Sequence, residues 1–191
     1  MFNVAVVGAT GAVGSTMLRV LEERGFPVSE LRPLASARSA GKSIEFLGKD
    51  FAVRELSNTS FEGIDIALFS AGGPRSRSFA PAAVEAGAVV IDNSSAYRMD
   101  PDVPLVVPEV NEDAIREHQG IIANPNCVAA IATVPLAPLH RANPIRRVVA
   151  ATYQAASGAG AAAMEELRAS TAAYLDGRAY ANTVLAHPYA F

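Results

Sequence analysis

Residues 2–14, FNVAVVGATGAVG, run from an apolar stretch into a loop with glycines three residues apart. The apolar run Phe2–Val7 is typical of a short buried strand, and apolar residues at helical spacing predict a helix directly after the loop. They are Val13, Met17, Leu18 and Leu21, and Gly25 and Pro27 end the helix. A strand, a glycine loop and a helix in this order predict a nucleotide-binding unit.

The glycine loop supplies the first set of expected cofactor contacts. Its spacing, G-x-x-G-x-x-G, allows a tight turn and a close approach of the backbone to a pyrophosphate, which the N–H groups of the helix N-terminus also attract. The expected contacts are Gly8, Thr10, Gly11, Ala12, Val13 and Gly14. The alternative is an ordinary glycine-rich connection, but the position between a strand and a helix argues against it.

The second expected strand, residues 31–35, ends where a dinucleotide site discriminates NAD from NADP. Arg38 follows this strand with Ser36 and Ser39 beside it and with no carboxylate nearby in the sequence. A cation and two hydroxyl groups suit a 2′-phosphate, so we predict NADP as the cofactor. A solvated loop arginine is the alternative.

Strands and helices continue to alternate up to about residue 100. Strands expected over residues 64–70 and 88–91 flank a helix expected over residues 75–86, which predicts a mainly parallel sheet covered on both faces. Open α/β sheets bind their ligands beyond the carboxyl ends of the strands. Three residues at the end of the first of these strands are therefore further expected cofactor contacts, namely Ser70, Ala71 and Gly72.

The pattern after residue 101 is less regular. The expected elements are a helix over 112–118 capped by Asn111, a strand at 121–122, a helix over 127–140, a strand over 147–154 and a helix over 161–175. Pro135 and Pro138 are expected to bend or shorten the helix over 127–140.

Composition limits the possible classes of protein. Half of the 191 residues are hydrophobic and 18% are charged, which is typical of a globular protein with a core. The net charge of −3 gives no support for nucleic-acid binding or a polybasic membrane role. A single cysteine cannot form an internal disulfide and fits a reducing compartment. We expect no transmembrane segment and no signal peptide, and hence a cytoplasmic location.

The single cysteine, Cys127, follows Asn124-Pro125-Asn126, a sequence typical of a turn and a helix cap. A helix N-terminus stabilises a thiolate, so Cys127 is a candidate nucleophile. Backbone N–H groups or Asn126 there could also bind an oxyanion. A buried structural cysteine is an equally good interpretation of this position alone.

Other polar residues occupy positions where a site could form. Arg98 follows the strand over 88–91 through a polar loop, and its guanidinium could bind a phosphate or a carboxylate, or simply lie at the surface. Gln154 ends an expected strand before a glycine turn. We expect His118 and His140 to be solvated, assign no catalytic role to them or to His187, and predict no metal site.

Seven segments, in this order, resemble the aspartate-β-semialdehyde dehydrogenase family. They are GATGAVG (8–14), LASARSAG (34–41), FSAGG (69–73), DNSSAYRMD (92–100), VPEVN (107–111), NPNC (124–127) and TYQAASGAG (152–160). The resemblance implies an α/β fold with a Rossmann-type NADP-binding domain over residues 1–125. It further implies the beginning of an α+β catalytic and dimerisation domain over residues 126–191, and a homodimer for the complete enzyme.

The resemblance also implies a reaction in the synthesis of lysine, threonine and methionine. Cys127 would attack β-aspartyl phosphate and expel phosphate, and NADPH would reduce the resulting thioester to aspartate semialdehyde. The other implied roles are phosphate binding by Asn93 and Arg98, substrate positioning by Gln154, and cofactor contacts by Ser157 and Gly158.

The sequence departs from the family in two ways. The family usually has a hydroxyl pair after the cysteine, whereas Val128 and Ala129 stand here. The family's chain also continues beyond the equivalent of Phe191, into a part with an acid/base histidine and a substrate-binding arginine. We therefore expect a fragment with very low turnover on its own and with exposed apolar surface that favours aggregation. The alternatives are a nucleotide-binding module or degenerate paralogue without catalysis, and a related N-acetyl-glutamyl-phosphate reductase.

Overall fold

The structure is a computed structural model that describes residues 1–186. The chain divides into two compact units, Met1–Val148 and a second that begins at Val149. The boundary expected between the NADP-binding domain and the catalytic domain, at residues 125 and 126, stays a prediction, because a division into compact units does not test it. Within residues 1–186, no helix is both long enough and apolar enough to cross a membrane.

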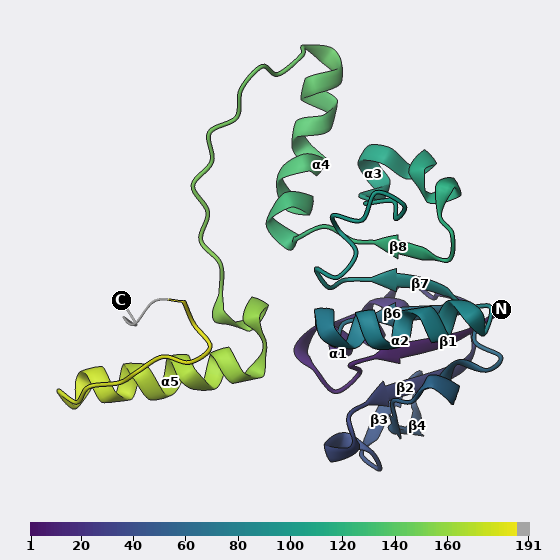
Figure 1. The fold of residues 1–191 in the computed structure, drawn as a ribbon, viewed down its shortest axis with the longest axis horizontal. Helices are drawn as coiled ribbons and strands as arrows, with labels where there is room; N and C mark the ends of the chain where they lie inside the picture. The colour runs from purple at the N-terminus through teal and green to yellow at the C-terminus, as the bar shows by residue number, and fades with distance from the viewer. Residues whose placement is uncertain (187–191) are drawn as a thin grey trace. The chain divides into compact units, whose positions relative to one another are not determined.

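Six parallel strands form the sheet of the first unit, in the spatial order β5-β2-β1-β6-β7-β8 (Figure 1). They are β1 (Phe2–Val7), β2 (Val28–Ala35), β5 (Arg54–Glu55), β6 (Ile66–Phe69), β7 (Val89–Asp92) and β8 (Ile121–Ala123). The chain proceeds from β1 to β2 on one side and then crosses to β6 on the other, so the strand order reverses at β1. This doubly wound order confirms the predicted Rossmann-type fold class.

Alternate side chains of β1 enter two separate cores, because successive residues of a strand point to opposite faces of the sheet. Ala5 and Val7 belong to the core beneath helix α2 (Gly73–Glu85). Val4 and Val6 belong to the core beneath helix α1 (Ala12–Glu23), and the two helices therefore cover opposite faces.

Helix α1 follows the predicted pattern except at its start. Leu18 is buried and Met17 and Leu21 pack against the same core, as the helical spacing predicts. Val13 was expected on this apolar face but is 41% exposed. It lies in the first turn, before the helix reaches the core. The helix ends at Glu23, and Gly25 follows with a φ of +57°, as expected of a glycine at a helix end.

The strand register places several loops at one edge of the sheet. Val7 pairs with both Leu34 and Phe69, Phe69 pairs with Asp92, and Asp92 pairs with Ala123. The strands therefore end side by side, and their loops begin at Gly8, Ser36, Ser70, Asn93 and Asn124. Neighbouring strands lie about 4.8 Å apart, so these loops form a continuous polar edge.

A hairpin of β3 (Ser43–Phe46) and β4 (Lys49–Ala52), which the sequence analysis missed, lies between β2 and β5 in the chain. Its turn consists of Leu47 and Gly48, both with positive φ (50° and 70°). Phe46 is buried in the core beneath α1, so the hairpin extends that core.

The helix expected over residues 112–118 is present, but as a 3-10 helix over Glu112–Glu117 and without a side-chain cap from Asn111. A short helix α3 (Pro108–Asn111) leads into a 3-10 helix, η3 (Glu112–Glu117). Asn111 does not cap a helix with its side chain, because that side chain accepts a hydrogen bond from the Val107 N–H at 2.9 Å and donates one to the Leu105 carbonyl at 3.0 Å. These local partners compete with capping.

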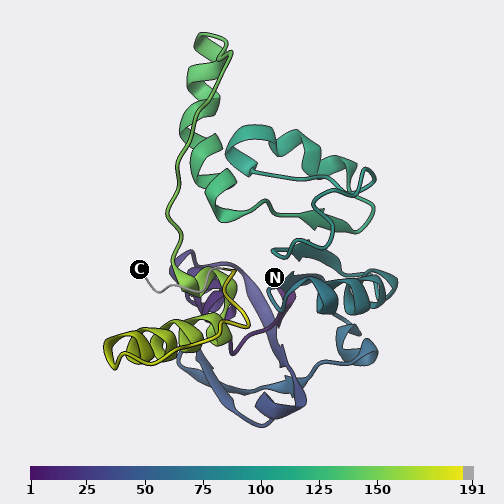
Figure 2. The same cartoon turned by 60° about the vertical axis from the view of Figure 1, so that its left-hand side comes forward.

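Helix α4 (Cys127–Ala142) begins where predicted and continues through both prolines, so the prolines do not shorten it. The prediction of a strand over residues 147–154 is wrong, since this segment has no regular structure (Figure 2). An alternating sequence forms a strand only with a hydrogen-bonded neighbour, and none pairs with it among residues 1–186.

The second unit contains a 3-10 turn, η4 (Ala156–Ala159), and helix α5 (Ala161–Leu175), whose bounds match the prediction. The segment that follows α5 runs back along the helix (Figures 1 and 2). Glu166, a buried residue of α5, accepts hydrogen bonds from the backbone N–H groups of Thr183, Val184 and Leu185.

Candidate active site

The glycine loop is shaped by contacts between backbone atoms. Gly8 has a φ of +88°, its N–H donates to the Leu34 carbonyl at 2.8 Å, and its own carbonyl accepts from the Gly11 N–H at 2.9 Å. A Cβ atom at Gly14 would lie 2.2 Å from the Gly8 carbonyl oxygen, which is closer than any real contact. The start of α1 therefore touches the loop only because residue 14 is glycine.

This loop fits the pyrophosphate of a dinucleotide. The N–H groups in the first turn of α1, at Ala12, Val13 and Gly14, have no acceptor within the helix. Thr10, Gly11, Ala12 and Val13 are exposed, so an anion can reach them. Unpaired N–H groups at an accessible helix N-terminus bind phosphate well.

The loop after β2 lies against the glycine loop. Thr10 Oγ1 donates to Ser39 Oγ at 3.4 Å, so the structure brings these two predicted contacts together. Ser39 is buried and Ser36 is half-buried, whereas Arg38 is exposed. Among the described residues, Arg38 forms no side-chain hydrogen bond or salt bridge.

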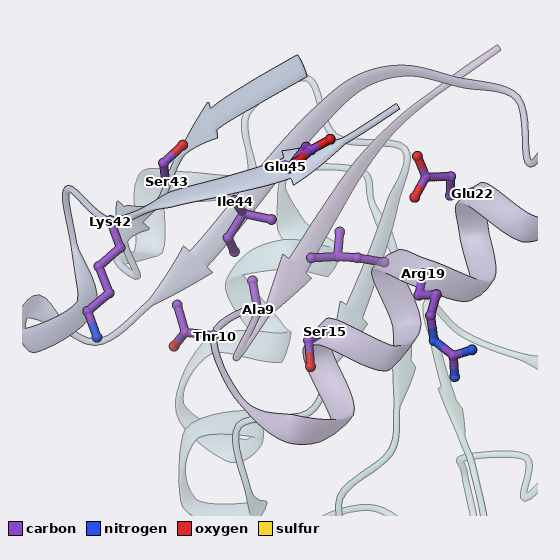
Figure 3. A pocket seen from close by; sticks show the side chains of 10 residues that line it. Ala9, Thr10, Ser15, Arg19, Glu22, Lys42, Ser43, Ile44 and Glu45 are labelled. Carbon is purple, nitrogen blue, oxygen red and sulfur yellow. The ribbon is translucent and has the colours of Figure 1, made fainter. Parts of the chain in front are cut away.

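A pocket of about 390 Å³ opens between α1 and β3 (Figure 3). Leu18 and Ile44 contribute apolar walls, and Thr10 and Lys42 lie at one end. Lys42 was not predicted from the sequence, although a second cation four residues after Arg38 with no acid between them was a usable signal. The Lys42 ammonium, like Arg38, has no partner within residues 1–186.

The end of β6 meets the glycine loop. Ser70 Oγ donates to the Val7 carbonyl at 3.1 Å, and a Cβ at Gly8 would lie 3.1 Å from Ser70. Gly72, with a φ of +87°, caps α2. Ser70 thus lies against Gly8, and Ala71 and Gly72 follow it in the chain, at the point where the strand order reverses, which is where doubly wound sheets bind ligands.

Two predicted phosphate ligands lie together with the segment that leads to the cysteine. Arg98 Nε donates to the Asn124 carbonyl at 2.9 Å, and Arg98 Nη2 donates to the Asn93 carbonyl at 3.1 Å. The Asn124 side chain donates to Asn93 Oδ1 at 2.6 Å. Arg98 Nη1 has no partner among the described residues, so its N–H groups remain for an anion.

Cys127 is exposed at the first position of α4, which overturns the interpretation of it as a buried structural cysteine. The Asn126 side chain caps the helix by accepting from the Val128 N–H at 3.0 Å, and Cys127 Sγ lies 3.9 Å from the same oxygen. The thiol is accessible and stands at the positive end of the helix dipole.

Gln154 and Gly158 belong to the second unit and contact each other. A Cβ at Gly158 would lie 2.9 Å from Gln154 Nε2, so the glycine leaves room for this carboxamide. Ser157 lies beside them in η4. The predicted approach of these residues to Cys127 and to the cofactor stays a prediction.

The histidines contact backbone groups. His118 is half-buried, contrary to the expectation that it is solvated, and its Nδ1 accepts from the Gly120 N–H at 2.9 Å. His140 is exposed, and its Nδ1 accepts from the Ile145 N–H at 3.0 Å. His187 lies outside the described residues. In the part of the chain that the structure describes, no three His, Cys, Asp or Glu side chains group as metal ligands would.

Two family models match the chain. One, described as the NAD binding domain of semialdehyde dehydrogenase, matches residues 3–118, and the other, described as its dimerisation domain, matches residues 136–191. The aspartate-semialdehyde dehydrogenase of Synechocystis sp. (strain ATCC 27184 / PCC 6803 / Kazusa) is 51% identical over 189 residues, which are 99% of this chain and 56% of that protein.

Solved structures give the same result. The structure is similar to a crystal structure of aspartate semialdehyde dehydrogenase II from Vibrio cholerae, with a TM-score of 0.92 and 51% identity over 100% of this chain and 58% of that one. The aspartate semialdehyde dehydrogenase of Candida albicans, solved with NADP, has a TM-score of 0.62 and 28% identity over 76% and 48% of the two chains. The chain spans somewhat more than half the length of the relatives that it matches.

Proposed function

The chain belongs to the semialdehyde dehydrogenase family, and on that premise we propose that it serves the NADPH-dependent reduction of β-aspartyl phosphate to aspartate semialdehyde. The observation that carries the proposal is the position of Cys127. Its exposed thiol lies at the start of α4, at the same sheet edge as the glycine loop. The hydrogen-bond network of Arg98, Asn93 and Asn124 lies at this edge too, and Asn124 comes three residues before Cys127 in the chain. A nucleophile, an anion-binding group and a dinucleotide loop therefore share one edge.

The chain carries the family's NAD-binding domain, and we propose NADP as its form of the nicotinamide dinucleotide. Arg38 and Lys42 are two cations in one acid-free loop that have no partner within residues 1–186, and a dianionic 2′-phosphate would neutralise both. We expect Arg38→Ala to weaken NADPH binding about thirtyfold and Lys42→Ala about fivefold, with NADH binding unchanged. Fluorescence titration measures both cofactors, and an equal loss of NADH affinity would refute the 2′-phosphate assignment.

The chemistry of the chain's own residues begins at Cys127. The thiolate, stabilised by the N-terminus of α4, attacks the acyl carbon, so that a C–S bond forms and the C–O bond to phosphate breaks. Arg98 Nη1, which has no partner in the described part of the chain, holds the departing phosphate. NADPH, when bound, supplies the hydride that converts the thioester to the aldehyde oxidation level. The aldehyde then leaves, and Cys127 returns to the thiolate.

Two wider proposals follow from family membership. The match of residues 136–191 to the dimerisation-domain model supports a homodimer for the whole protein. The proposed product supports a place in the synthesis of lysine, threonine and methionine. A separate prediction is that the 191-residue chain on its own has very low catalytic activity.

Formation of the acyl-enzyme tests the nucleophile without requiring turnover. The chain is incubated with β-aspartyl phosphate in the absence of NADPH, and its intact mass is measured. We expect one acyl adduct on Cys127 and none on Cys127→Ser, because the first covalent step needs only the thiolate and a leaving group. NADPH binding by a folded chain that forms no adduct would contradict the proposal and would favour a nucleotide-binding module.

A further inference from the structure

Asp92, the last residue of β7, carries a fully buried carboxylate outside the set of predicted site residues. Its Oδ1 accepts from Ser76 Oγ at 2.7 Å and from the Ser94 N–H at 3.1 Å, and its Oδ2 accepts from Ser94 Oγ at 2.7 Å. A buried carboxylate is costly unless donors surround it. These three donors come from α2 and from the loop after β7, so the carboxylate joins the two.

The same network extends along the loop. Ser94 Oγ accepts from the Ala96 N–H at 3.0 Å, and the Tyr97 hydroxyl donates to the Ser76 carbonyl at 3.4 Å. Burial first, and then the negative charge of Asp92, raises the pKa of Tyr97, which Arg77 partly opposes from 6.0 Å above its ring. The two hydrogen bonds to Ser76 join Asp92 and Tyr97 to α2, and the bonds of Ser94 hold the loop to Asp92 and to itself.

The loop ends at Arg98, whose guanidinium is fixed from the other side. Arg98 donates to the Asn93 and Asn124 carbonyls, and the Asn93 N–H donates to the Phe69 carbonyl at 2.9 Å. The direction of Arg98 Nη1 thus depends on where the backbone of residues 93–98 lies. Only one carboxylate sets that backbone in place among the described residues.

We propose that Asp92 is a positioning residue for Arg98: it fixes the loop over residues 93–97 against α2 so that Arg98 Nη1 faces a bound phosphate group. This inference rests on the proposed function, because it names the support for the phosphate-binding arginine of that site. Asp92 itself is buried and does not touch the anion.

The test uses the Nε–Hε NMR signal of Arg98 in the ¹⁵N-labelled 191-residue chain, assigned with Arg98→Lys and titrated with inorganic phosphate. We expect Asp92→Asn and Ser94→Ala to shift this signal, to speed its hydrogen exchange and to weaken phosphate binding about tenfold. NADPH binding should not change. Ser94→Thr, which keeps the hydroxyl, should restore the wild-type signal, and Ser78→Ala, an exposed serine of α2, should have no effect.

The outcomes separate this inference from the proposed function. An unchanged Arg98 signal and unchanged phosphate affinity in folded Asp92→Asn would overturn the positioning role. If Asp92→Asn does not fold, Ser94→Ala decides the same point, since it removes a donor to the carboxylate and the acceptor of the Ala96 N–H. If phosphate does not shift the Arg98 signal of the wild-type chain, the phosphate site is refuted. Hydrogen exchange of Nε–Hε in the variants would still test the positioning role of Asp92.

Discussion

Helices α1 and α4 both begin at the carboxyl edge of the parallel sheet, yet they are stabilised in different ways. Helix α1 buries Gly14 and Leu18 within the first unit. Helix α4 buries none of its residues, and Ile131 and Leu139 are 74% and 59% exposed. The glycine loop is therefore shaped by backbone packing that leaves no space for a Cβ atom at Gly14. The position of Cys127, the proposed nucleophile, depends on a cap and a few hydrogen bonds.

The apolar surface of α4 bears on an expectation from the sequence. Large exposed apolar surface was expected, and the exposure of Ile131, Val134 and Leu139 confirms it for this helix. Such surfaces promote association between molecules. Aggregation of the 191-residue chain stays a prediction, which light scattering at increasing concentration would check.

The largest effect is expected at the contact between Gly8 and Gly14. Gly14→Ala places a Cβ 2.2 Å from the Gly8 carbonyl oxygen, so the start of α1 must move away from the loop. We expect a loss of about 3–4 kcal/mol in the free energy of unfolding, or failure to fold, and loss of NADPH binding. Urea denaturation and cofactor titration measure the two effects.

Gly11→Ala is the matched control, because its Cβ would lie 3.3 Å from the same oxygen and Gly11 has an ordinary φ of −85°. We expect a loss of no more than about 1 kcal/mol there, since the neighbour has to yield only slightly. Equal stability of the two variants would show that the loop is more adaptable than its packing indicates.

Truncation of one leucine in each helix tests the comparison directly. Leu18→Ala in α1 removes a buried side chain and should cost about 3 kcal/mol, whereas Leu139→Ala in α4 should change stability by about 0.5 kcal/mol or less. Urea denaturation of both variants gives the two values. A large loss at Leu139 would mean that α4 is packed in solution, and the contrast between the helices would fail.

We expect the cap of α4 to contribute more to the free energy of unfolding than the exposed apolar residues of this helix do. Asn126→Ala removes the side chain that accepts from the Val128 N–H, and we expect a cost of about 1 kcal/mol and fraying of the first turn. Slower acylation of Cys127 should accompany it, because the thiolate loses the ordered helix N-terminus. Asn126→Asp, which keeps a capping oxygen, should retain the stability. Wild-type acylation rates in Asn126→Ala would show that the cap does not support the nucleophile.

Local sequence was sufficient where local contacts decide the structure. Strand β1 and helix α5 have the predicted bounds, and the glycine loop lies as expected between β1 and α1. The helix over 112–118 is a 3-10 helix, and the cap expected from Asn111 failed because its side chain bonds to nearer backbone partners. The strand over 147–154 failed because alternation cannot supply the neighbouring strand that it needs.

The candidate site shows the same division between local and distant information. The helix-terminal position of Cys127 could be predicted from the residues beside it. The proposed roles of Lys42 and Asp92 were not predicted, since they depend on contacts across the fold: the pocket between α1 and β3, and the hydrogen bonds to Asp92 from α2 and from the loop after β7. The amino-acid sequence by itself does not show which distant residues such contacts bring together.

Helix α5 in the second unit shows a third kind of stabilising interaction, in which a buried carboxylate accepts hydrogen bonds from another segment. Burial alone would raise the pKa of Glu166. Hydrogen bonds from the backbone N–H groups of Thr183, Val184 and Leu185 and from the Thr183 hydroxyl lower that pKa from 4.5 to about 2. The Thr183 N–H and the Leu185 N–H donate at 2.5 Å and 2.6 Å. Ionised Glu166 therefore attaches the segment after α5 to the helix more strongly than protonated Glu166 would.

The pH dependence of this attachment is the smallest and most local effect that we expect. Because the folded pKa lies below the unfolded one, the contribution of Glu166 is complete above about pH 4.5 and is lost as the pH falls toward 2. The amide protons of Thr183, Val184 and Leu185 should exchange faster across this interval, while those of β1 stay protected. Glu166→Gln should show fast exchange of the same amides already at pH 6, because an uncharged group accepts more weakly from these donors. Equal protection in Glu166→Gln and the wild type would mean that the segment after α5 is attached by other contacts, and that α5, like α1, is stabilised by packing.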